Sequence, residues 1–295
     1  MNKNAAISII VLLLIALSLI TAGSQGSIMI DGYPLIDGYP LFAICGSIGL
    51  ILHWIFFIPS YVLKTDHYFD LIGSISYVVT VITAAMLVAP SLDMRGMIIC
   101  GMIVLWATRL GLFLFTRIKQ DGKDVRLDVI KTQFMLFLRL WTFGGLWVLA
   151  TAGAGLAAMT SAISLKIGII GYIGIALWVF GFMIEIIADS QKRQFRKDPN
   201  NKGRFISTGV WSWSQHPNYF GEITLWFGIA LLAYPVLLGW QLATLISPVF
   251  VYLLLTKVSG INLLDDIAKE RWGSDPEYLD YTRRTSKLIL SLPKK

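Results

Sequence analysis

Long apolar runs alternate with short polar segments along the whole chain. The runs are roughly 18 to 25 residues long, the length that a helix needs to cross a hydrocarbon core about 30 Å thick. Several runs have no polar face, although a helix at the surface of a soluble protein would need one. The pattern therefore predicts an all-α fold, a polytopic transmembrane helical bundle with about eight spans: 5–22, 41–63, 71–90, 97–116, 133–155, 167–188, 217–234 and 240–257.

The composition agrees with this class of protein and argues against a metal site. The chain is 56% hydrophobic and 15% charged, whereas soluble domains carry about 25% charged residues. Its two cysteines, Cys45 and Cys100, lie inside apolar runs, where cysteine behaves as a small hydrophobic residue. The three histidines are far apart in the sequence, so no spacing typical of metal ligands arises. We expect a mechanism without a metal.

The positions of lysine and arginine predict the sidedness. If the N-terminus is cytoplasmic, 21 of the 25 Lys and Arg residues fall in cytoplasmic segments, whereas Arg95 and Lys166 lie on the opposite side. The reversed topology would contradict the positive-inside rule. Both termini are therefore predicted to be cytoplasmic. The net charge of +7 is then explained by the membrane and not by a nucleic-acid partner.

The first apolar run has two interpretations. Lys3, the short run itself and the small residues at 22–24 also fit a cleaved signal peptide, which would leave seven spans instead of eight. We favour a retained helix because the run is almost uninterrupted over 18 residues.

Ionisable residues interrupt several of the predicted spans. Such residues are energetically costly inside a bilayer and usually serve a function. Under the predicted topology they all lie at mid-depth or in the cytoplasmic half, so we expect them to share a polar cavity that opens to the cytoplasm. These residues are His53, Arg109, Arg139, Glu185, Asp189 and Glu222.

A charged stripe continues from the sixth predicted span. Glu185, Asp189, Arg193 and Arg196 have the spacing i, i+4, i+8 and i+11, which places them within about 80° of arc on one helix face. The sign changes along the stripe, from acids near the bilayer to arginines beyond it. This pattern fits either helix-surface pairs with a basic cytoplasmic flank or a nucleotide site, with acids on ribose hydroxyls and cations on phosphates.

The start of the seventh predicted span is a second candidate region. Pro217 fits the first turn of a helix, where its missing N–H is harmless. The exposed N–H groups and the positive dipole end of that helix would face the basic segment, an arrangement that binds anions. Asn218 and Glu222 are i,i+4 neighbours that project from the same side.

These segments resemble the steroid 5-alpha-reductase-like membrane enzymes, specifically the bacterial branch of that family. The resemblance is specific over 185–290; elsewhere it consists of hydropathy, Arg109 and the positions 124–126. The segments that carry it are 188–196, 203–211, 216–222, 257–264 and 278–285. The apolar runs divide the chain into an N-terminal helix with an outer loop (1–40) and a transmembrane bundle (41–257). The resemblance adds an overlapping cofactor-binding region that includes the cytoplasmic C-terminal tail (185–290).

The resemblance implies that NADPH binds in the cytoplasmic half and that a hydride passes to a conjugated carbon–carbon double bond of a lipid from the bilayer. It implies an integral protein of the bacterial inner membrane whose active site faces the cytoplasm. In the family, the stretch matching Asp189 to Arg204 holds ribose and phosphates, and the positions of Asn218 and Glu222 lie near the nicotinamide. The expected cofactor-binding residues are Glu185, Asp189, Arg193, Arg196, Arg204, His216, Asn218, Glu222 and Lys257.

The chain departs from the steroid-reducing members at the groups that polarise the substrate carbonyl. Those members carry a Gln-Glu pair in an early span and a Tyr in the span matching 97–116, whereas this chain has His53-Trp54 and Trp106. Another donor is therefore needed, because enone reduction requires a proton or a hydrogen bond at the carbonyl oxygen. The expected catalytic residues are His53, Arg109 and Tyr219, with Tyr77 as a further candidate donor.

Other functions fit parts of the sequence. Isoprenylcysteine carboxyl methyltransferases have a similar His-Pro-x-Tyr-x-Gly-Glu helix start, but their cofactor, S-adenosylmethionine, has no phosphates to pair with the cations at 192–204. A transporter or a lipid-binding scaffold often has internal repeats or broken helices, and neither is evident. The polar tail 258–295 is predicted either to lie along the membrane and cover the cofactor or to be a solvated basic tail.

Overall fold

The computed structural model describes residues 3–89, 91–121, 127–258 and 260–292. These residues form helices and two isolated β-bridges, with no strand among them. The all-α prediction is therefore confirmed for the described part of the chain. The long helices are α1 (Lys3–Ser24), α2 (Leu41–Val62), α3 (Phe69–Val88), α4 (Met94–Asp121), α6 (Phe134–Met159), α7 (Ile169–Lys197) and α8 (Pro217–Ala233).

Shorter helical elements complete the fold. They are α5 (Leu127–Ile130), α9 (Ser247–Leu253), α10 (Ile261–Trp272), α11 (Pro276–Arg284), the 3₁₀ turns η1 (Pro199–Asn201), η2 (Gly209–Ser212), η3 (Tyr234–Val236) and η4 (Gly239–Ile246), and a π-helical segment, η5 (Leu254–Val258).

Eight helical stretches within the described residues are long and apolar enough to cross a membrane, which confirms the predicted number of spans. The first seven predicted runs match single α-helices. The eighth differs, because 240–257 is a succession of 3₁₀, α and π geometry. The sidedness, with both termini in the cytoplasm, stays a prediction. Positions 124–126 lie outside the described residues.

Polar residues set several helix starts. The carboxylate of Asp93 accepts a hydrogen bond from the Gly96 N–H (2.8 Å) and so caps α4. Asp275 does the same for α11 through the Glu277 N–H (2.9 Å), with Pro276 in the first turn. Pro217 begins α8, as the sequence predicts.

The chain divides into two compact units, Met1–Gly171 with Ala230–Ser247 and Tyr172–Ile229 with Pro248–Lys295. In the first unit α6 is the central helix, and α1, α2, α3, α4 and η4 pack against it. Its residues from Val148 to Met159 are all buried. A Cβ atom at Gly145 would lie 2.7 Å from the Leu50 Cα atom, so this glycine allows α2 and α6 to approach closely.

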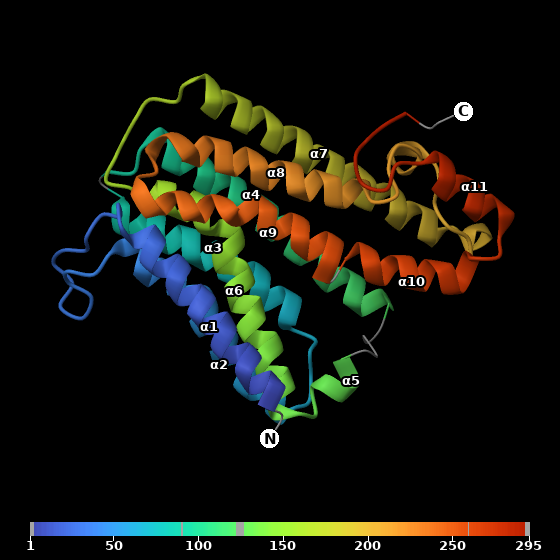
Figure 1. Cartoon of the computed structure of the whole chain (residues 1–295), viewed down its shortest axis with the longest axis horizontal. Coiled ribbons are helices and arrows are strands. Elements are labelled where there is room, and N and C mark those ends of the chain that lie inside the picture. The colour runs from blue at the N-terminus through green and yellow to red at the C-terminus, as the bar shows by residue number, and fades with distance from the viewer. Residues whose placement is uncertain (1–2, 90, 122–126, 259, 293–295) are drawn as a thin grey trace. The chain divides into compact units, whose positions relative to one another are not determined.

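The second unit holds most of α7 and α8 and the helices α9 to α11. Figure 1 shows α7 and α8 running side by side, and the C-terminal segment curling back beyond α11. All nine residues proposed for the cofactor, from Glu185 to Lys257, lie within this unit. The predicted division into 1–40, 41–257 and 185–290 stays a prediction.

Candidate functional site

Two pairs of glycines bring α7 and α8 into backbone contact. A Cβ atom at Gly221 would lie 2.5 Å from the Gly181 carbonyl oxygen, and one at Gly228 would lie 2.5 Å from the Gly174 carbonyl oxygen. The two glycines on α7 are seven residues apart, and so are the two on α8. Because the later glycine of α8 meets the earlier glycine of α7, the two helices are antiparallel. Small residues at such positions let membrane helices pack closely. The contact fixes the register of everything on the facing surfaces.

This register places Glu185 and Glu222 at nearly the same level of the second unit, with Asp189 one turn further along α7. The backbone nitrogen of Glu185 lies 2.8 Å from the position of a Cβ atom on Gly221, the residue before Glu222. One turn further, the Asn218 amide donates a hydrogen bond to the Asp189 carboxylate (Nδ2 to Oδ1, 3.4 Å). The exposed fractions are 2% for Glu185, 7% for Asp189 and 9% for Glu222. Burying ionised carboxylates is costly unless they are paired, and each of these has interaction partners.

Cations follow the acids along α7, as the stripe predicted. Arg193 is half-buried, and Arg196 is exposed one turn later. The Lys192 ammonium lies 4.5 Å from the centroid of the Trp211 ring, a cation–π contact. Arg204 is exposed on the loop after α7, where Gly203 has a φ of 81° that favours glycine. The unit therefore offers buried acids and more accessible cations on one continuous helix and its following loop.

The loop between α7 and α8 is fixed to the acidic part of α7. The Trp211 indole N–H donates to the Ala188 carbonyl (3.0 Å), and the Val210 N–H donates to the Gln191 amide oxygen (3.0 Å). Val210 and Trp211 also pack against Ala188. The segment that leads into α8 is thus held beside Asp189, which the sequence alone did not indicate.

His216 lies at the start of α8 in a crowded, charged environment. Its ring stacks on Tyr219, with centroids 5.6 Å apart and planes 11° apart. Its Nε2 atom lies 3.7 Å from the Asp265 carboxylate of α10. Burial lowers the pKa of His216 to about 4; Asp265 opposes this shift, and Lys192 and Lys287 add to it. The imidazole is therefore neutral near pH 7.

The C-terminal segment folds onto the same loop. The Gln215 N–H donates to the Ser286 carbonyl (2.8 Å), and the Ser291 N–H donates to the Trp213 carbonyl (3.1 Å). The Tyr281 hydroxyl donates to the Trp211 carbonyl (2.7 Å), and burial raises the pKa of that phenol. Figure 1 shows this segment returning toward the loop between α7 and α8. The tail is therefore packed and not freely solvated over these residues.

An aromatic cluster joins the loop to α10 and α11. The Phe205 ring lies 5.2 Å from Tyr278, 5.4 Å from Tyr281 and 5.9 Å from Trp272, measured between centroids. The Trp272 indole N–H donates to the Gly203 carbonyl (2.6 Å). These contacts place Arg204 between two residues that are fixed to the C-terminal helices.

The remaining candidates are distributed over both units. His53 and Arg109 belong to the first unit and Tyr219 to the second. Arg109 is half-buried, with its guanidinium 5.3 Å from the Phe113 ring centroid. Lys257 is exposed on the π-helical segment η5. Thus Glu185, Asp189 and Glu222 are brought together, whereas the wider convergence of charged residues from several spans stays a prediction.

The surroundings of His53 determine the tautomer of its neutral imidazole. Its Nδ1 atom lies 2.7 Å from the Gly49 carbonyl oxygen, so Nδ1 carries the proton and donates. Its Nε2 atom, then an acceptor, has no hydrogen-bond partner among the described residues. Phe69 and Trp141 pack edge-on around the ring, which is 1% exposed. In this tautomer Nε2 can accept a hydrogen bond but cannot donate one.

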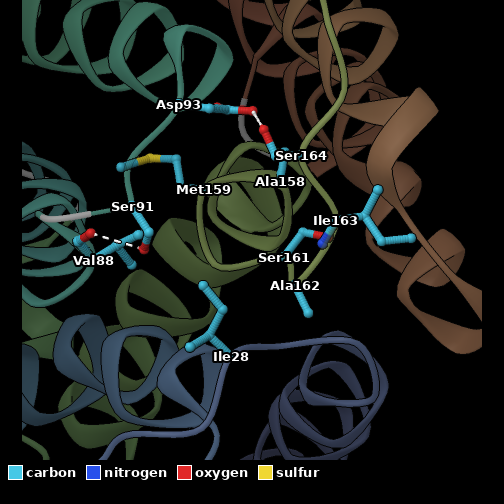
Figure 2. Close-up of a pocket in the computed structure, with 10 residues that line it drawn as sticks. All are labelled: Ile28, Val88, Ser91, Asp93, Ala158, Met159, Ser161, Ala162, Ile163 and Ser164. Carbon is cyan, nitrogen blue, oxygen red and sulfur yellow. Dashed lines mark hydrogen bonds between the residues drawn. The ribbon is translucent and has the colours of Figure 1, made fainter.

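A pocket in the first unit is a separate feature (Figure 2). It has a volume of about 110 Å³ and is lined mainly by the ends of α3 and α6, the segment between α3 and α4 and the chain after α6. Its carboxylate, Asp93, is bound to the Ser164 hydroxyl (2.9 Å). Sites for cofactors and drug-sized ligands measure about 300–1,000 Å³, so this pocket is too small for a nucleotide. Within the described ranges, no group of three or more His, Cys, Asp or Glu could hold a metal ion.

Some residues at the site were not predicted. The paired glycines, seven residues apart in each helix, were a visible signal for close helix packing. Asp265, which contacts His216, and Lys287, whose charge acts on it, were not recognisable, because they lie about 50 and 70 residues later in the chain. No local periodicity links such distant positions.

Fold and site together define a polytopic α-helical membrane protein with a charged helical site in its second unit. The chain belongs to the family described as "Protein of unknown function (DUF1295)", whose profile matches residues 56–285. The predicted resemblance to steroid 5-alpha-reductase-like enzymes is confirmed at this level.

Two curated proteins are similar to parts of the chain. The chain is 34% identical over 70 residues to 3-oxo-5-alpha-steroid 4-dehydrogenase 1 of Bos taurus. The matched segment covers 24% of this chain and 27% of that protein. It is 25% identical over 178 residues to an uncharacterized protein of Schizosaccharomyces pombe, covering 50% and 52% of the two chains. The matches thus span about a quarter and about half of these relatives. No solved structure matches the chain.

Proposed function

We propose that this protein is a membrane-embedded, NADPH-dependent reductase of a conjugated carbon–carbon double bond in a lipid, such as a steroid-like, isoprenoid or acyl enone. The observation that carries the proposal is the order of charged side chains along α7, with buried acids first and accessible cations after them. The acids lie beside the part of α8 that carries Asn218 and Glu222. The steroid dehydrogenase relative supports the reaction class.

The side chains of the second unit fit the chemical groups of a dinucleotide phosphate. Carboxylates and amides bind ribose hydroxyls, and Asp189 with Asn218 supplies both. Arginines bind phosphates through paired N–H donors, and Arg193, Arg196 and Arg204 are accessible enough to do so. When bound, NADPH supplies the hydride that one alkene carbon accepts. Glu222, on the same face of α8 as Asn218, would help to orient the nicotinamide end.

The chain must supply a proton or a hydrogen bond to the conjugated carbonyl, and the other alkene carbon must receive a proton. Neutral His53 cannot donate from Nε2, because its proton is on Nδ1. Arg109 and Tyr219 are therefore the better donors, since a guanidinium and a phenol both carry donor hydrogens. His53 would instead accept a hydrogen bond from a hydroxyl group.

The proposal includes a location and partners. The cations of α7 and of the following loop favour a cofactor site on the cytoplasmic side. The substrate would enter from the bilayer of a bacterial inner membrane. No metal and no nucleic acid take part. A methyltransferase that uses S-adenosylmethionine is less well supported, because that cofactor has no phosphate for Arg193, Arg196 and Arg204.

Binding and turnover of the purified full-length protein in lipid nanodiscs test the proposal. We expect NADPH to bind and to be oxidised when a membrane lipid extract is added. Glu222→Gln and Asn218→Ala should each weaken NADPH binding by about tenfold or more, the effect of losing one hydrogen bond to a charged group. Glu270→Gln on α10 and Asn200→Ala on η1, both exposed, are the matched controls. Binding of S-adenosylmethionine without binding of NADPH would contradict the proposal.

A further inference from the structure

Asp265 on α10 contacts the start of α8 through His216. We propose that Asp265 is a positioning residue for the proposed reduction: it holds the imidazole of His216, which in turn holds the phenol of Tyr219. The inference rests on the proposed function, in which Tyr219 is a candidate donor to the substrate carbonyl.

The carboxylate of Asp265 lies between two cationic or titratable groups. One of its oxygens, Oδ1, is 3.7 Å from His216 Nε2. The other, Oδ2, accepts a hydrogen bond from the Lys287 ammonium of the C-terminal segment. A separation of 3.7 Å is too long for a direct hydrogen bond, and the neutral imidazole carries no net charge, so the Asp265 carboxylate acts on the dipole of the ring. Asp265 therefore connects the C-terminal segment to the start of α8.

His216 transmits this contact to Tyr219 by ring stacking. The two rings are nearly parallel, 11° apart, with centroids separated by 5.6 Å, and His216 directly precedes the helix α8 that carries Tyr219. His216 is 8% exposed, so its ring has little freedom to move. A shift of the imidazole would change the orientation of the phenol. Misplacing a reacting group by about 1 Å can lower a rate by as much as about 100-fold.

Charged groups from several elements face His216. Asp265 comes from α10, Lys192 from α7 and Lys287 from the C-terminal segment, and all of them act on its pKa. Asp265 raises that pKa, whereas the lysines and burial lower it. Removal of the Asp265 charge should therefore lower the pKa of His216 further. This change is measurable without any substrate.

The kinetic test compares neighbouring aspartates in the full-length protein. Asp265→Asn should lower kcat by about tenfold and leave KM for NADPH within about twofold. Asp266→Asn is the matched control, because Asp266 is exposed on the same helix; it should change kcat by no more than about twofold, the size of ordinary surface effects.

A double-mutant cycle tests whether Asp265 acts through His216. His216→Phe keeps an aromatic ring beside Tyr219 but removes the group that Asp265 attracts. In the His216→Phe background, Asp265→Asn should have no further effect on kcat, since contacting residues give non-additive effects. Full additivity of the two changes would overturn the proposal.

A histidine NMR titration provides a readout that does not need turnover. The chain has three histidines, so the His216 signal of protein labelled with [13C]histidine can be assigned with His216→Phe. Asp265→Asn should move the titration of His216 to lower pH, and Asp266→Asn should not. An unchanged His216 titration would overturn the contact. Absence of NADPH turnover in the wild type, by contrast, would overturn the proposed function and with it the kinetic role of Asp265.

Discussion

In the first unit, two buried ionisable side chains bind backbone carbonyls of the same unit. His53 donates to the Gly49 carbonyl, and Arg95, which is 1% exposed, donates to the carbonyls of Leu165 and Leu232. In the second unit, buried carboxylates come from two facing helices, and Asn218 of α8 binds Asp189 of α7. In the first arrangement, side chains are bound to main-chain carbonyls. In the second arrangement, side chains from two helices face one another.

Under the proposed function, the difference separates buried charges that serve stability from buried charges that suit a ligand. A guanidinium that donates hydrogen bonds to main-chain oxygens connects helices and loops, and these charge-assisted bonds stabilise the fold. Carboxylates followed by accessible arginines on the same helix supply the groups that ribose and phosphate need. The following predictions test this contrast, from the largest expected effect to the smallest.

Gly221→Ala should disrupt the second unit. The new Cβ atom would lie 2.5 Å from the Gly181 carbonyl oxygen and 2.8 Å from the Glu185 nitrogen, and backbone atoms cannot rotate away as a side chain can. We expect a loss of about 1–3 kcal/mol of stability and weaker NADPH binding, because Glu185 and Glu222 would be displaced. Thermal unfolding in detergent and an NADPH titration measure these effects.

The matched control is Gly101→Ala on α4, where an added Cβ atom meets nothing within 4 Å. Because alanine is the better helix former, this change should stabilise by about 0.5–1 kcal/mol. Equal effects of the two substitutions would refute the close packing of α7 and α8.

Acidification should destabilise the second unit through His216. Its folded pKa, about 4, is lower than the value of about 6.5 for an unfolded chain. The stabilising contribution is therefore complete above pH 6.5 and is lost as the pH falls toward the folded value, by about 2 kcal/mol between pH 6.5 and 5. Hydrogen exchange of peptides from α8 and α10 should report it. His216→Gln should remove this part of the pH dependence, and a slope that persists in the variant would contradict the assignment.

Gly144→Ala should have a smaller effect, confined to the first unit. The added Cβ atom would lie 2.7 Å from His53 Nε2 and 2.6 Å from its Cδ2 atom, but a side chain can yield more easily than backbone. We expect a loss of about 1 kcal/mol, at the lower end of the cost of overpacking, with NADPH affinity retained. A large loss of NADPH affinity would break the contrast between the units.

Arg283→Gln should have the smallest effect. The Arg283 guanidinium lies 2.7 Å from the Asp280 carboxylate on α11 and is largely exposed. Exposed ion pairs contribute about 0–1 kcal/mol, so the unfolding temperature and NADPH affinity should hardly change. A loss of stability comparable to that of Gly221→Ala would mean that α11 contributes more to the stability of the second unit than its contacts indicate.

Much of the fold is encoded locally and could be predicted. Apolar run length gave the eight spans, because each helix satisfies its own backbone hydrogen bonds in the bilayer. The order of acids and arginines on α7 followed from helical periodicity, since residues four apart share a face. The eighth span was less predictable: 3₁₀ and π turns in η4 and η5 have the same hydropathy as an α-helix.

The sequence by itself therefore determined the class of protein, the number of spans and the helix that carries the charged stripe. Tertiary structure decided which residues meet that stripe. The contact of Gly181 with Gly221 sets the level at which Glu185 and Glu222 lie, and the fold of the C-terminal segment brings Asp265 to His216. Such contacts join positions 40 or more residues apart, and they depend on helix register and side-chain packing, which no local pattern of residues specifies.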